Sequence, residues 1–531
     1  MGVSRDRPWF KFWPEGVPHH VNYPNVPLFE LVSSAARKYP DNIAFSYREH
    51  SLTYRELDLA TSKLAVGLNE LGIKKGDTVT LLLPNSFDFV IGYYGILKAG
   101  GIVTPVNPTY KSEDLRHQID DSRATTIITN ASSYPIVEKL KDETGLKAII
   151  VTDSDGSEEA LSLSEILAGH SASPTHLDVK PKEDTAVITY TGGTTGFPKG
   201  AMLSHYNLVA NAIQNATWFA WSNKDVIIGL LPFYHSWGGC TCLNSPIYSG
   251  ARVIIVPHFD AEELLATIEK ERATVLYGAV SMFTMLVSSP VISKYDLSSL
   301  RYIKAGAMPI PPEIKERWEQ LTGVKMILGY GLSEACPETH NSPPQRVKTK
   351  TVGIPLIDTD ARIVDEETGE NELPPGKVGE LVIRGPQVMK GYLNRPEDSR
   401  EALRNGWLYT GDLAVMDEEG YFYIVDRKKE TIKYKGYTIA PAEVEAALYE
   451  HPAVKDCAVV GKPDALAGEV PKAYVVLKEG HHLSEEELIS FCGQRLAPYK
   501  KIREVEFIGE IPRTQVGKTL RRVLRDRERR Q

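Results

Sequence analysis

The ten residues 191–200, TGGTTGFPKG, have the composition of a loop that holds phosphate groups. Glycines let a backbone approach a ligand closely, and a lysine supplies a positive charge for phosphate oxygens. The familiar nucleotide-binding loop is different, since its lysine follows a glycine directly and precedes Ser or Thr. By itself the stretch fits a flexible hairpin with an exposed lysine better than a phosphate loop. The side chains that could contact phosphate are Thr191, Thr194, Thr195 and Lys199.

An apolar strand and an amphipathic helix are expected on either side of this loop. DTAVITY (184–190) is apolar and β-branched, which predicts a buried strand. SHYNLVANAIQNA (204–216) begins with Ser204, a good N-cap residue, and repeats apolar residues at helical spacing. These two elements would hold the loop at one end of a sheet.

Nine further stretches of the chain belong to the same set of motifs as the loop. Together they follow, in order, the motifs of the adenylate-forming superfamily, which the chain therefore resembles over nearly its whole length. That superfamily contains acyl- and aryl-CoA ligases, beetle luciferases and the adenylation domains of peptide synthetases. The stretches are LTYREL (52–57), LKAGGIVTPVNP (97–108), LPFYHSWG (231–238), AGAMP (305–309), GYGLSEA (329–335), GELVIRGPQVMKGY (379–392), YTGD (409–412), DRKKETIKYKG (426–436) and PRTQVGKT (512–519).

The resemblance implies a two-step activation of a carboxylic acid. A carboxylate is a poor electrophile because its negative charge repels nucleophiles. In the superfamily the carboxylate attacks the α-phosphate of ATP, which gives acyl-AMP and pyrophosphate, and a thiol then displaces AMP. The first step moves charge among phosphates and needs cations and fixed donors.

The resemblance also implies which residues bind ATP. The threonines and the lysine of the loop would hold the β- and γ-phosphates, and Glu334 would bind Mg²⁺, whose usual ligands are carboxylate and phosphate oxygens. Asp412 and Arg427 would contact the ribose. Local sequence alone also fits a solvated acid at Glu334 and an Asp that closes a turn at Asp412. Tyr330 would lie against the adenine, in a pocket completed by Gly306, Ala307, Gly329, Gly331 and Ser333.

Three lysines and a histidine receive catalytic or hinge roles from the resemblance. Lys518 would bridge ATP and the carboxylate during adenylation. Lys433 would act from the opposite face of the C-terminal domain during thioester formation, and Lys429 falls at the hinge position between these two states. His235 would sit where the acyl carboxylate meets the thiol, although a single His beside an apolar strand is also a common structural residue.

The acid is predicted to be a fatty acid and the acceptor free coenzyme A. Amino-acid-activating relatives place an Asp after the Phe of the third motif, whereas Tyr234 follows Phe233 here. An unpaired ammonium in an apolar pocket would be costly, which disfavours an amino-acid substrate. The chain ends soon after Lys518 without a carrier domain, which favours coenzyme A. The candidate acyl-pocket residues are His235, Trp237, Met308, Cys336 and Pro337.

Several alternatives stay open on the sequence alone. RPWFKFWPEGVP (7–18) and the phosphate loop look more like a medium- or long-chain fatty-acid–CoA ligase than a plant-type aryl ligase, but an aryl acid is the second candidate. Loading of a separate acyl-carrier protein is a third reading. A nucleotide-binding relative without ligase activity is a fourth, and a luciferase-like oxygenase finds no positive support.

Composition excludes several other classes of protein. The 531 residues carry 61 Lys+Arg and 69 Asp+Glu, a net charge of −8 that does not favour nucleic-acid binding. Five scattered cysteines argue against a disulfide scaffold and against a structural metal site. The sequence shows neither a signal peptide nor a run of membrane-spanning length, so a cytoplasmic enzyme is expected. Peripheral membrane association and a homodimer are left open.

The fold class is predicted as α/β in the larger part and α+β in the smaller. Strands and helices alternate through the first four hundred residues, which points to α/β layers, followed by a β-rich, barrel-like part. After Arg427 the texture changes to a compact α+β module. We therefore expect a domain of residues 1–427 that binds AMP and the acyl group, and a mobile lid domain of residues 428–531.

Overall fold

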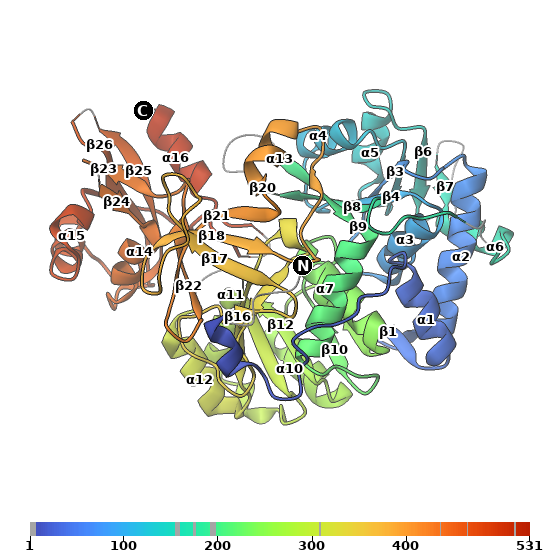
Figure 1. The fold of residues 1–531 in the computed structure, drawn as a ribbon, viewed down its shortest axis with the longest axis horizontal. Coiled ribbons are helices and arrows are strands. Elements are labelled where there is room, and N and C mark those ends of the chain that lie inside the picture. Colours follow the sequence, from blue (N-terminus) through green and yellow to red (C-terminus); the bar gives the residue numbers. More distant parts are fainter. Residues whose placement is uncertain are drawn as a thin grey trace. The chain divides into compact units, whose positions relative to one another are not determined.

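The computed structural model describes residues 7–153, 160–173, 177–191, 198–306, 310–435, 437–464, 466–514 and 517–530. The chain divides into two compact units. Among the described residues, the larger unit contains those within 7–191, 198–360 and 383–408, and the smaller contains those within 361–382 and 409–530. The mixture of helices and strands in a larger and a smaller unit confirms the predicted fold class (Figure 1). The domain boundary at residue 427 and the mobility of the C-terminal part stay predictions.

The first sheet of the larger unit carries the phosphate loop. Strands β4 (Ile102–Pro105), β3 (Thr78–Leu82), β5 (Thr126–Thr129) and β6 (Ala148–Val151) run parallel and are almost entirely buried. Near one edge, β8 and β9 form an antiparallel hairpin, and β9 pairs in turn with the two-residue strand β19. The strand order is β19 (Gly391–Tyr392), β9 (Lys199–Ser204), β8 (Thr185–Thr191), β4 (Ile102–Pro105), β3 (Thr78–Leu82), β5 (Thr126–Thr129), β6 (Ala148–Val151) and β7 (Leu161–Ser162).

The second sheet of the larger unit carries the stretches GYG and AGAMP. Its central strands are parallel, while β15 runs antiparallel to β14. The strand order is β16 (Ile354–Pro355), β15 (Glu338–Asn341), β14 (Met326–Gly331), β13 (Tyr302–Gly306), β12 (Val275–Ala279), β10 (Val226–Gly229), β11 (Arg252–Ile255), β1 (Ile43–Tyr47) and β2 (His50–Thr53).

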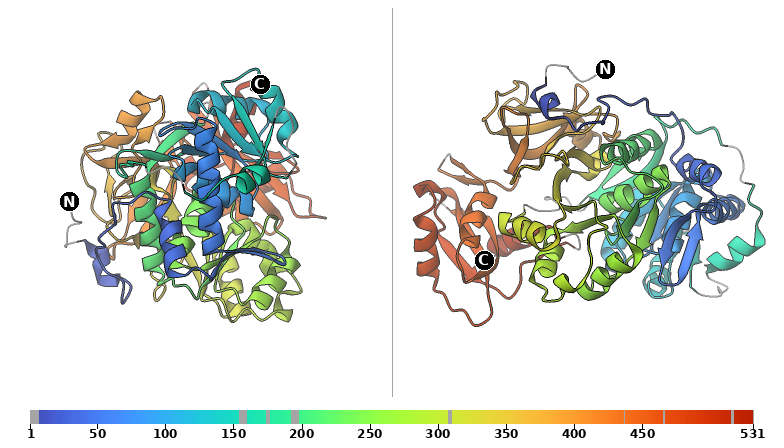
Figure 2. Two further views of the ribbon diagram at one scale, coloured as in Figure 1. Left: turned by 90° about the vertical axis from the view of Figure 1, so that its right-hand side faces the viewer. Right: turned by 90° about the horizontal axis from the view of Figure 1, so that it is seen from below.

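Helices cover these sheets. The helices α1, α2 and α3 pack against one another, and they appear as the blue helices in the left view of Figure 2. The α-helices of the larger unit are α1 (Glu30–Lys38), α2 (Tyr54–Glu70), α3 (Phe87–Lys98), α4 (Ser112–Ser122), α5 (Tyr134–Lys141), α6 (Leu163–Gly169), α7 (His205–Trp218), α8 (Ser236–Gly238), α9 (Ser245–Ser249), α10 (Ala261–Glu271), α11 (Val280–Ser288), α12 (Pro312–Thr322) and α13 (Pro396–Ala402). Shorter turns are η1 (Pro8–Phe12), η3 (Ile292–Lys294), η4 (Ser333–Ala335) and the π-helical η2 (Gly239–Asn244).

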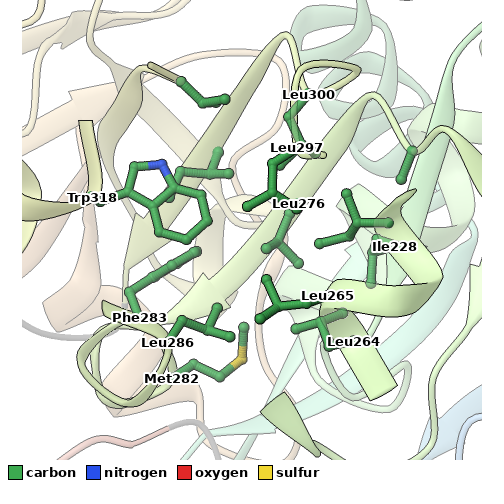
Figure 3. Packing of buried hydrophobic residues seen from close by; sticks show 14 of the residues in the cluster. Ile228, Leu264, Leu265, Leu276, Met282, Phe283, Leu286, Leu297, Leu300 and Trp318 are labelled. Carbon is green, nitrogen blue, oxygen red and sulfur yellow. The ribbon is translucent and has the colours of Figure 1, made fainter. Parts of the chain in front are cut away.

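A dense apolar core fixes the second sheet. Side chains of α10, α11 and α12 pack on β10, β12 and β13 (Figure 3). Phe283 and Trp318 meet edge to face, with ring centroids 5.4 Å apart. Such aromatic pairs add stability beyond the area that they bury. The strands that carry the candidate site residues therefore rest on a rigid support.

Two further five-stranded sheets lie mostly in the smaller unit. One has the order β17 (Asp360–Val364), β18 (Gly379–Arg384), β21 (Trp407–Met416) and β20 (Leu403–Arg404), with β22 (Phe422–Arg427) also paired to β21. The other has the order β24 (Tyr437–Ile439), β23 (Ile432–Tyr434), β26 (Gly468–Leu477) and β25 (Val454–Asp464), with β27 (Glu504–Phe507) also paired to β26. The first of these sheets is the β-rich part that the sequence indicated.

The helices of the smaller unit pack on both faces of its second sheet. The alternating residues Cys457 and Val459 of β25 face a core that includes side chains of α14 and α15, and Ala458 and Val460 face Leu524 of α16. The sequence marks the start of the first two helices: Pro441 is at the first position of α14, and Ser484 caps α15. The helical elements are α14 (Pro441–Tyr449), α15 (Glu485–Gly493), η5 (Pro498–Lys500) and α16 (Arg521–Arg530).

No helix formed by the described residues combines the length and the apolar character that a membrane span requires.

Candidate active site

The phosphate loop connects two strands rather than a strand and a helix. Thr191 and Lys199 are register partners at the loop end of the β8–β9 hairpin, and the Thr191 hydroxyl donates to the Lys199 carbonyl over 3.4 Å. The predicted helix follows only after β9 and begins at His205, with Ser204 as its cap. Strand β9 was missed because KGAMLS is short and begins with Lys-Gly. Thr194 and Thr195, like Ala307 and Met308 further on, lie outside the described residues.

Lys199 does not extend freely into solvent. Its ammonium forms an ion pair with Asp398 of α13, and it also lies 5.4 Å from the ring centroid of Tyr392. The side chain is 23% exposed. Neither Asp398 nor Tyr392 was named from the sequence, although Tyr392 ends the motif GELVIRGPQVMKGY. The lysine is thus held at the hairpin by a counter-charge and an aromatic face.

Glu334 lies close to the same tyrosine. The Tyr392 hydroxyl donates a hydrogen bond to Glu334 Oε1 over 2.8 Å, and the amide of Met389 donates to the Glu334 carbonyl over 2.8 Å. Ser333, beside it in η4, is hydrogen-bonded to Ser236 over 2.9 Å. The structure therefore brings the predicted metal ligand and the predicted phosphate lysine to one tyrosine.

The donor set at Glu334 fits a magnesium ion only in company with phosphate. Among the described residues there is no group of three or more His, Cys, Asp or Glu side chains that could hold a metal by themselves. A single carboxylate that shares Mg²⁺ with nucleotide phosphates and water is the usual arrangement for this ion. Glu334 would supply that carboxylate.

Three predicted adenine-site glycines are required by packing. A side chain at Gly331 would collide with the Pro337 carbonyl, and one at Gly306 would come within 2.8 Å of the Trp237 ring. At Gly329 a side chain would meet Asn341 and the end of Lys304. The glycines thus allow the strands to approach their own neighbours. Tyr330 sits between two of them, with its ring 5.8 Å from that of His340.

A buried ion pair lies beneath this strand. Lys304 of β13 binds Glu338 of β15, and their side chains are only 2% and 3% exposed. Burial lowers the pKa of the Lys304 ammonium below its usual value. The Asn211 side chain forms two hydrogen bonds with the backbone of Glu338. It donates to the carbonyl over 2.8 Å and accepts from the amide over 3.1 Å. The sequence signal for this pair is a single charged residue in each of two short strands whose other residues carry no permanent charge.

Two of the predicted acyl-pocket residues line a small cavity. His235 caps α8, accepting at Nδ1 from the amide of Trp237 over 3.2 Å. His235 and the buried Cys336 both line a cavity of about 20 Å³ in the larger unit, and burial raises the pKa of the Cys336 thiol. That volume holds about one water molecule, so an acyl chain would have to displace side chains. Its other walls include Phe233, Tyr234, Gly239 and Cys240, whereas Trp237 and Pro337 are not among the lining residues.

The two predicted ribose residues meet in the smaller unit. Asp412 of β21 and Arg427 of β22 are register partners, and Arg427 Nε lies 3.0 Å from Asp412 Oδ1. The Asp412 side chain is only 5% exposed. The pair brings together a carboxylate, which can accept hydrogen bonds from the ribose hydroxyls, and a guanidinium, which can donate to them.

Lys429 lies in a hydrogen-bonded turn that starts at the end of β22. The amides of Glu430 and Thr431 both donate to the Arg427 carbonyl. The Lys429 carbonyl accepts from Arg525 of α16 over 3.0 Å. This turn is not apparent in the sequence because it contains neither Pro nor Gly.

Charged residues anchor both sides of this turn. Arg521 of α16 binds Glu430 at 2.6 Å and Glu445 at 2.7 Å. Before the turn, Asp426 accepts at Oδ2 from the amide of Ala442 over 2.9 Å, and burial raises its pKa to about 6. These contacts connect the end of β22 with α14 and α16.

Lys433 and Lys518 lie on separate segments of the smaller unit. Lys433 is the exposed central residue of β23, between Ile432 and Tyr434, which pack on the α14–α15 core. Lys518 lies in the turn before α16, where its amide donates to the Thr514 hydroxyl over 3.1 Å. Their assignment to opposite faces stays a prediction.

Comparison with known proteins places this arrangement in a family. Residues 32–393 match the AMP-binding enzyme family, and residues 443–518 match the AMP-binding enzyme C-terminal domain. A long-chain-fatty-acid–CoA ligase of Bacillus subtilis (strain 168) is 40% identical over 99% of both chains. Probable 4-coumarate–CoA ligase 1 of Dictyostelium discoideum is 36% identical over 95% of this chain and 96% of its own.

A solved structure agrees with the sequence relatives. ATP-bound MatB from Rhodopseudomonas palustris superposes with a TM-score of 0.88 at 30% identity, covering 94% of this chain and 99% of that one. The first family match spans more than half of the chain, and the relatives are aligned over nearly their whole length. The chain belongs to the AMP-binding enzyme family.

Proposed function

We propose that this protein joins a fatty acid to coenzyme A, with ATP as the energy source and acyl-AMP as the intermediate. The observation that carries the proposal is the convergence of Lys199 and Glu334 on Tyr392, because a phosphate-binding cation and a metal-binding carboxylate are both needed to transfer an adenylyl group. The 40% identity with a long-chain-fatty-acid–CoA ligase supports the fatty acid as substrate.

In the first half-reaction a carboxylate oxygen of the acid bonds to the α-phosphorus of ATP. The bond from that phosphorus to the bridging oxygen breaks, and pyrophosphate leaves with the electron pair. Lys199 and the threonines of its loop bind the β- and γ-phosphates, where negative charge accumulates. Glu334 would hold Mg²⁺, which would neutralise part of that charge. Tyr330 and the Asp412–Arg427 pair bind adenine and ribose.

In the second half-reaction the sulfur of coenzyme A bonds to the acyl carbon, and the bond from that carbon to the AMP oxygen breaks. The thiol proton is released to solvent, and AMP leaves as its anion. We assign Lys518 to the first half-reaction and Lys433 to the second. His235 lies at the acyl cavity, where the carboxylate and the thiol would meet.

Incubation with ATP, Mg²⁺, coenzyme A and a panel of acids tests the proposal. We expect AMP and a thioester in equal amounts, with the highest kcat/KM for fatty acids. AMP without thioester would point to an acyl-carrier protein as acceptor, and absence of ATP turnover with every acid would contradict the ligase assignment. Higher kcat/KM for hydroxycinnamic acids would favour the aryl alternative. The relative that corresponds to this alternative is the probable 4-coumarate–CoA ligase of 36% identity.

We also propose that the enzyme works in the cytoplasm and as a homodimer. The sequence predicts the first and leaves the second open. Cell fractionation would test the first and would detect membrane-associated enzyme. Light scattering tests the second, since a particle of 59.0 kDa would be a monomer and would contradict it.

Replacement of Lys199 by alanine is expected to slow adenylation by about 10²–10³-fold, the usual cost of removing one preorganised donor to a developing negative charge. Binding of the acid should change little. Acid-dependent exchange of labelled pyrophosphate into ATP measures this step. An exchange rate equal to that of the wild type would make the 191–200 segment an ordinary hairpin.

We propose that Lys429 is a hinge at which the C-terminal part turns between the half-reactions. Lys429→Pro fixes φ near −65° and should trap one orientation. Adenylation should then survive while thioester formation falls by orders of magnitude, measured separately by pyrophosphate exchange and by conversion of supplied acyl-AMP. Equal slowing of both steps would indicate a general folding defect, and no slowing of either would move the hinge elsewhere.

A further inference from the structure

Tyr392 has a backbone that is unusually well fixed for a residue in a two-residue strand. It pairs with Ala201 of β9, and its amide donates to the Ser399 hydroxyl of α13 over 2.8 Å. On either side of β19, the amides of Lys390 and Leu393 donate to carbonyls of β9 over 3.0 and 2.8 Å. The side chain is therefore presented from the same sheet edge as the phosphate-loop hairpin.

Two different parts of this side chain contact two different candidate site residues. The hydroxyl donates to Glu334 Oε1 over 2.8 Å, and the ring lies 5.4 Å from the Lys199 ammonium. A hydroxyl that donates to one carboxylate oxygen restricts rotation of the carboxylate and leaves the other oxygen for a cation. A cation over an aromatic face is attracted by the ring quadrupole, and the contact limits where the lysine can swing.

We propose that Tyr392 is a positioning residue that orients Glu334 for the metal and Lys199 for the phosphates through separate parts of one side chain. The inference rests on the proposed function, since it assumes that Glu334 binds the metal. Partners that orient a metal ligand from behind typically contribute about 10–100-fold to metal affinity. The two contacts predict two separable effects, one on the metal and one on the nucleotide.

Calorimetric titration of ATP into the full-length enzyme, with Mg²⁺ and with EDTA, tests this without relying on turnover. Tyr392→Phe removes the hydroxyl and keeps the ring. It should reduce the gain in ATP affinity that Mg²⁺ provides by about 10–100-fold and leave the affinity in EDTA unchanged. Tyr392→Leu removes both parts and should also weaken ATP binding in EDTA.

Three control variants make the result decisive. Tyr134→Phe removes another tyrosine-to-carboxylate hydrogen bond, of 2.9 Å to Glu138 on α5, and should behave as wild type. Glu334→Gln should lose most of the Mg²⁺ gain, and Lys199→Ala should weaken binding in EDTA. Thermal unfolding of each variant checks that it is folded, and Tyr392→Phe stands as the test if Tyr392→Leu does not fold.

The possible outcomes separate this inference from the proposed function. If Glu334→Gln loses the Mg²⁺ gain and Tyr392→Phe keeps it, the role of Tyr392 is overturned while the metal assignment stands. If Glu334→Gln keeps the full gain, the metal assignment of the proposed function fails, and the inference fails with it. Equal weakening by Tyr392→Phe in Mg²⁺ and in EDTA would also overturn the inference, because the hydroxyl would then act on the nucleotide alone.

Discussion

Replacing Lys518 by alanine is expected to reduce the rate of acyl-AMP formation by about 10²–10³-fold or more. The variant should still convert supplied acyl-AMP and coenzyme A to the thioester. Removal of a preorganised cation has an effect of this size on steps that develop negative charge. Lys433→Ala should show the reverse defect. Pyrophosphate exchange measures the first step, and release of AMP from synthetic acyl-AMP measures the second.

Lys455→Ala is a suitable control for both variants, because it removes an exposed lysine of β25 in the same unit. It should leave both half-reactions at the rate of the wild type. If Lys518→Ala and Lys433→Ala lost the same half-reaction, the division of labour between the two lysines would be wrong. Loss of both steps in both variants would point instead to damage to the fold.

Lys304→Met is expected to destabilise the larger unit by about 3–5 kcal/mol, because it leaves the carboxylate of Glu338 buried without its counter-charge. The double variant Lys304→Met/Glu338→Met should recover most of this loss, since exchanging a buried ion pair for apolar side chains of similar volume is often neutral. Denaturant titration followed by tryptophan fluorescence measures both. All seven tryptophans lie in the residue ranges of the larger unit, so the signal reports on that unit.

Arg116→Met provides the matched control, since it removes the cation of an exposed ion pair of the larger unit, in which Arg116 and Glu143 lie 2.6 Å apart with side chains 47% and 49% exposed. A pair of this kind contributes about 0–1 kcal/mol. A double variant that remained as unstable as Lys304→Met would show that Glu338 has a further essential partner. In that case its hydrogen bond from Asn341, at 3.3 Å, would be the first to examine.

Local patterns in the sequence were sufficient for several single elements. The apolar run 184–190 forms most of strand β8, and Ser204 caps α7 as expected. These signals are short-range: a run of apolar residues, a cap, a proline. The order of the motifs along the chain added the family and its reaction.

Pairings between distant segments were beyond such patterns. Tyr392 reaches Glu334 because β19 pairs with β9, a strand almost two hundred residues earlier in the chain. Nothing near Tyr392 in the sequence specifies that partner. The contacts of Tyr392 with Glu334 and of Asp398 with Lys199 were therefore missed, although Tyr392 ends a recognised motif and Asp398 follows it closely.

Gly329 shows a different limit of sequence reasoning. We predicted it as a nucleotide contact, but the structure gives it a packing role as well. Lys304 and Glu338 are on strands β13 and β15, which flank β14, and a side chain at Gly329 would occupy the space in which their charged groups meet. A buried lysine became possible because the residue between it and its partner has no side chain.

The hydrogen bond from Ala442 to Asp426 bears on the populations of the two proposed states. Asp426 precedes Lys429 and Ala442 follows it, so a turn about Lys429 would separate them. A buried carboxylate that loses a partner costs about 1–3 kcal/mol. Such a cost corresponds to an equilibrium constant of about 5–150 in favour of the orientation in which the bond is made. The chain would then rest in one state by default, and binding of substrate or release of pyrophosphate would have to shift the balance toward the other.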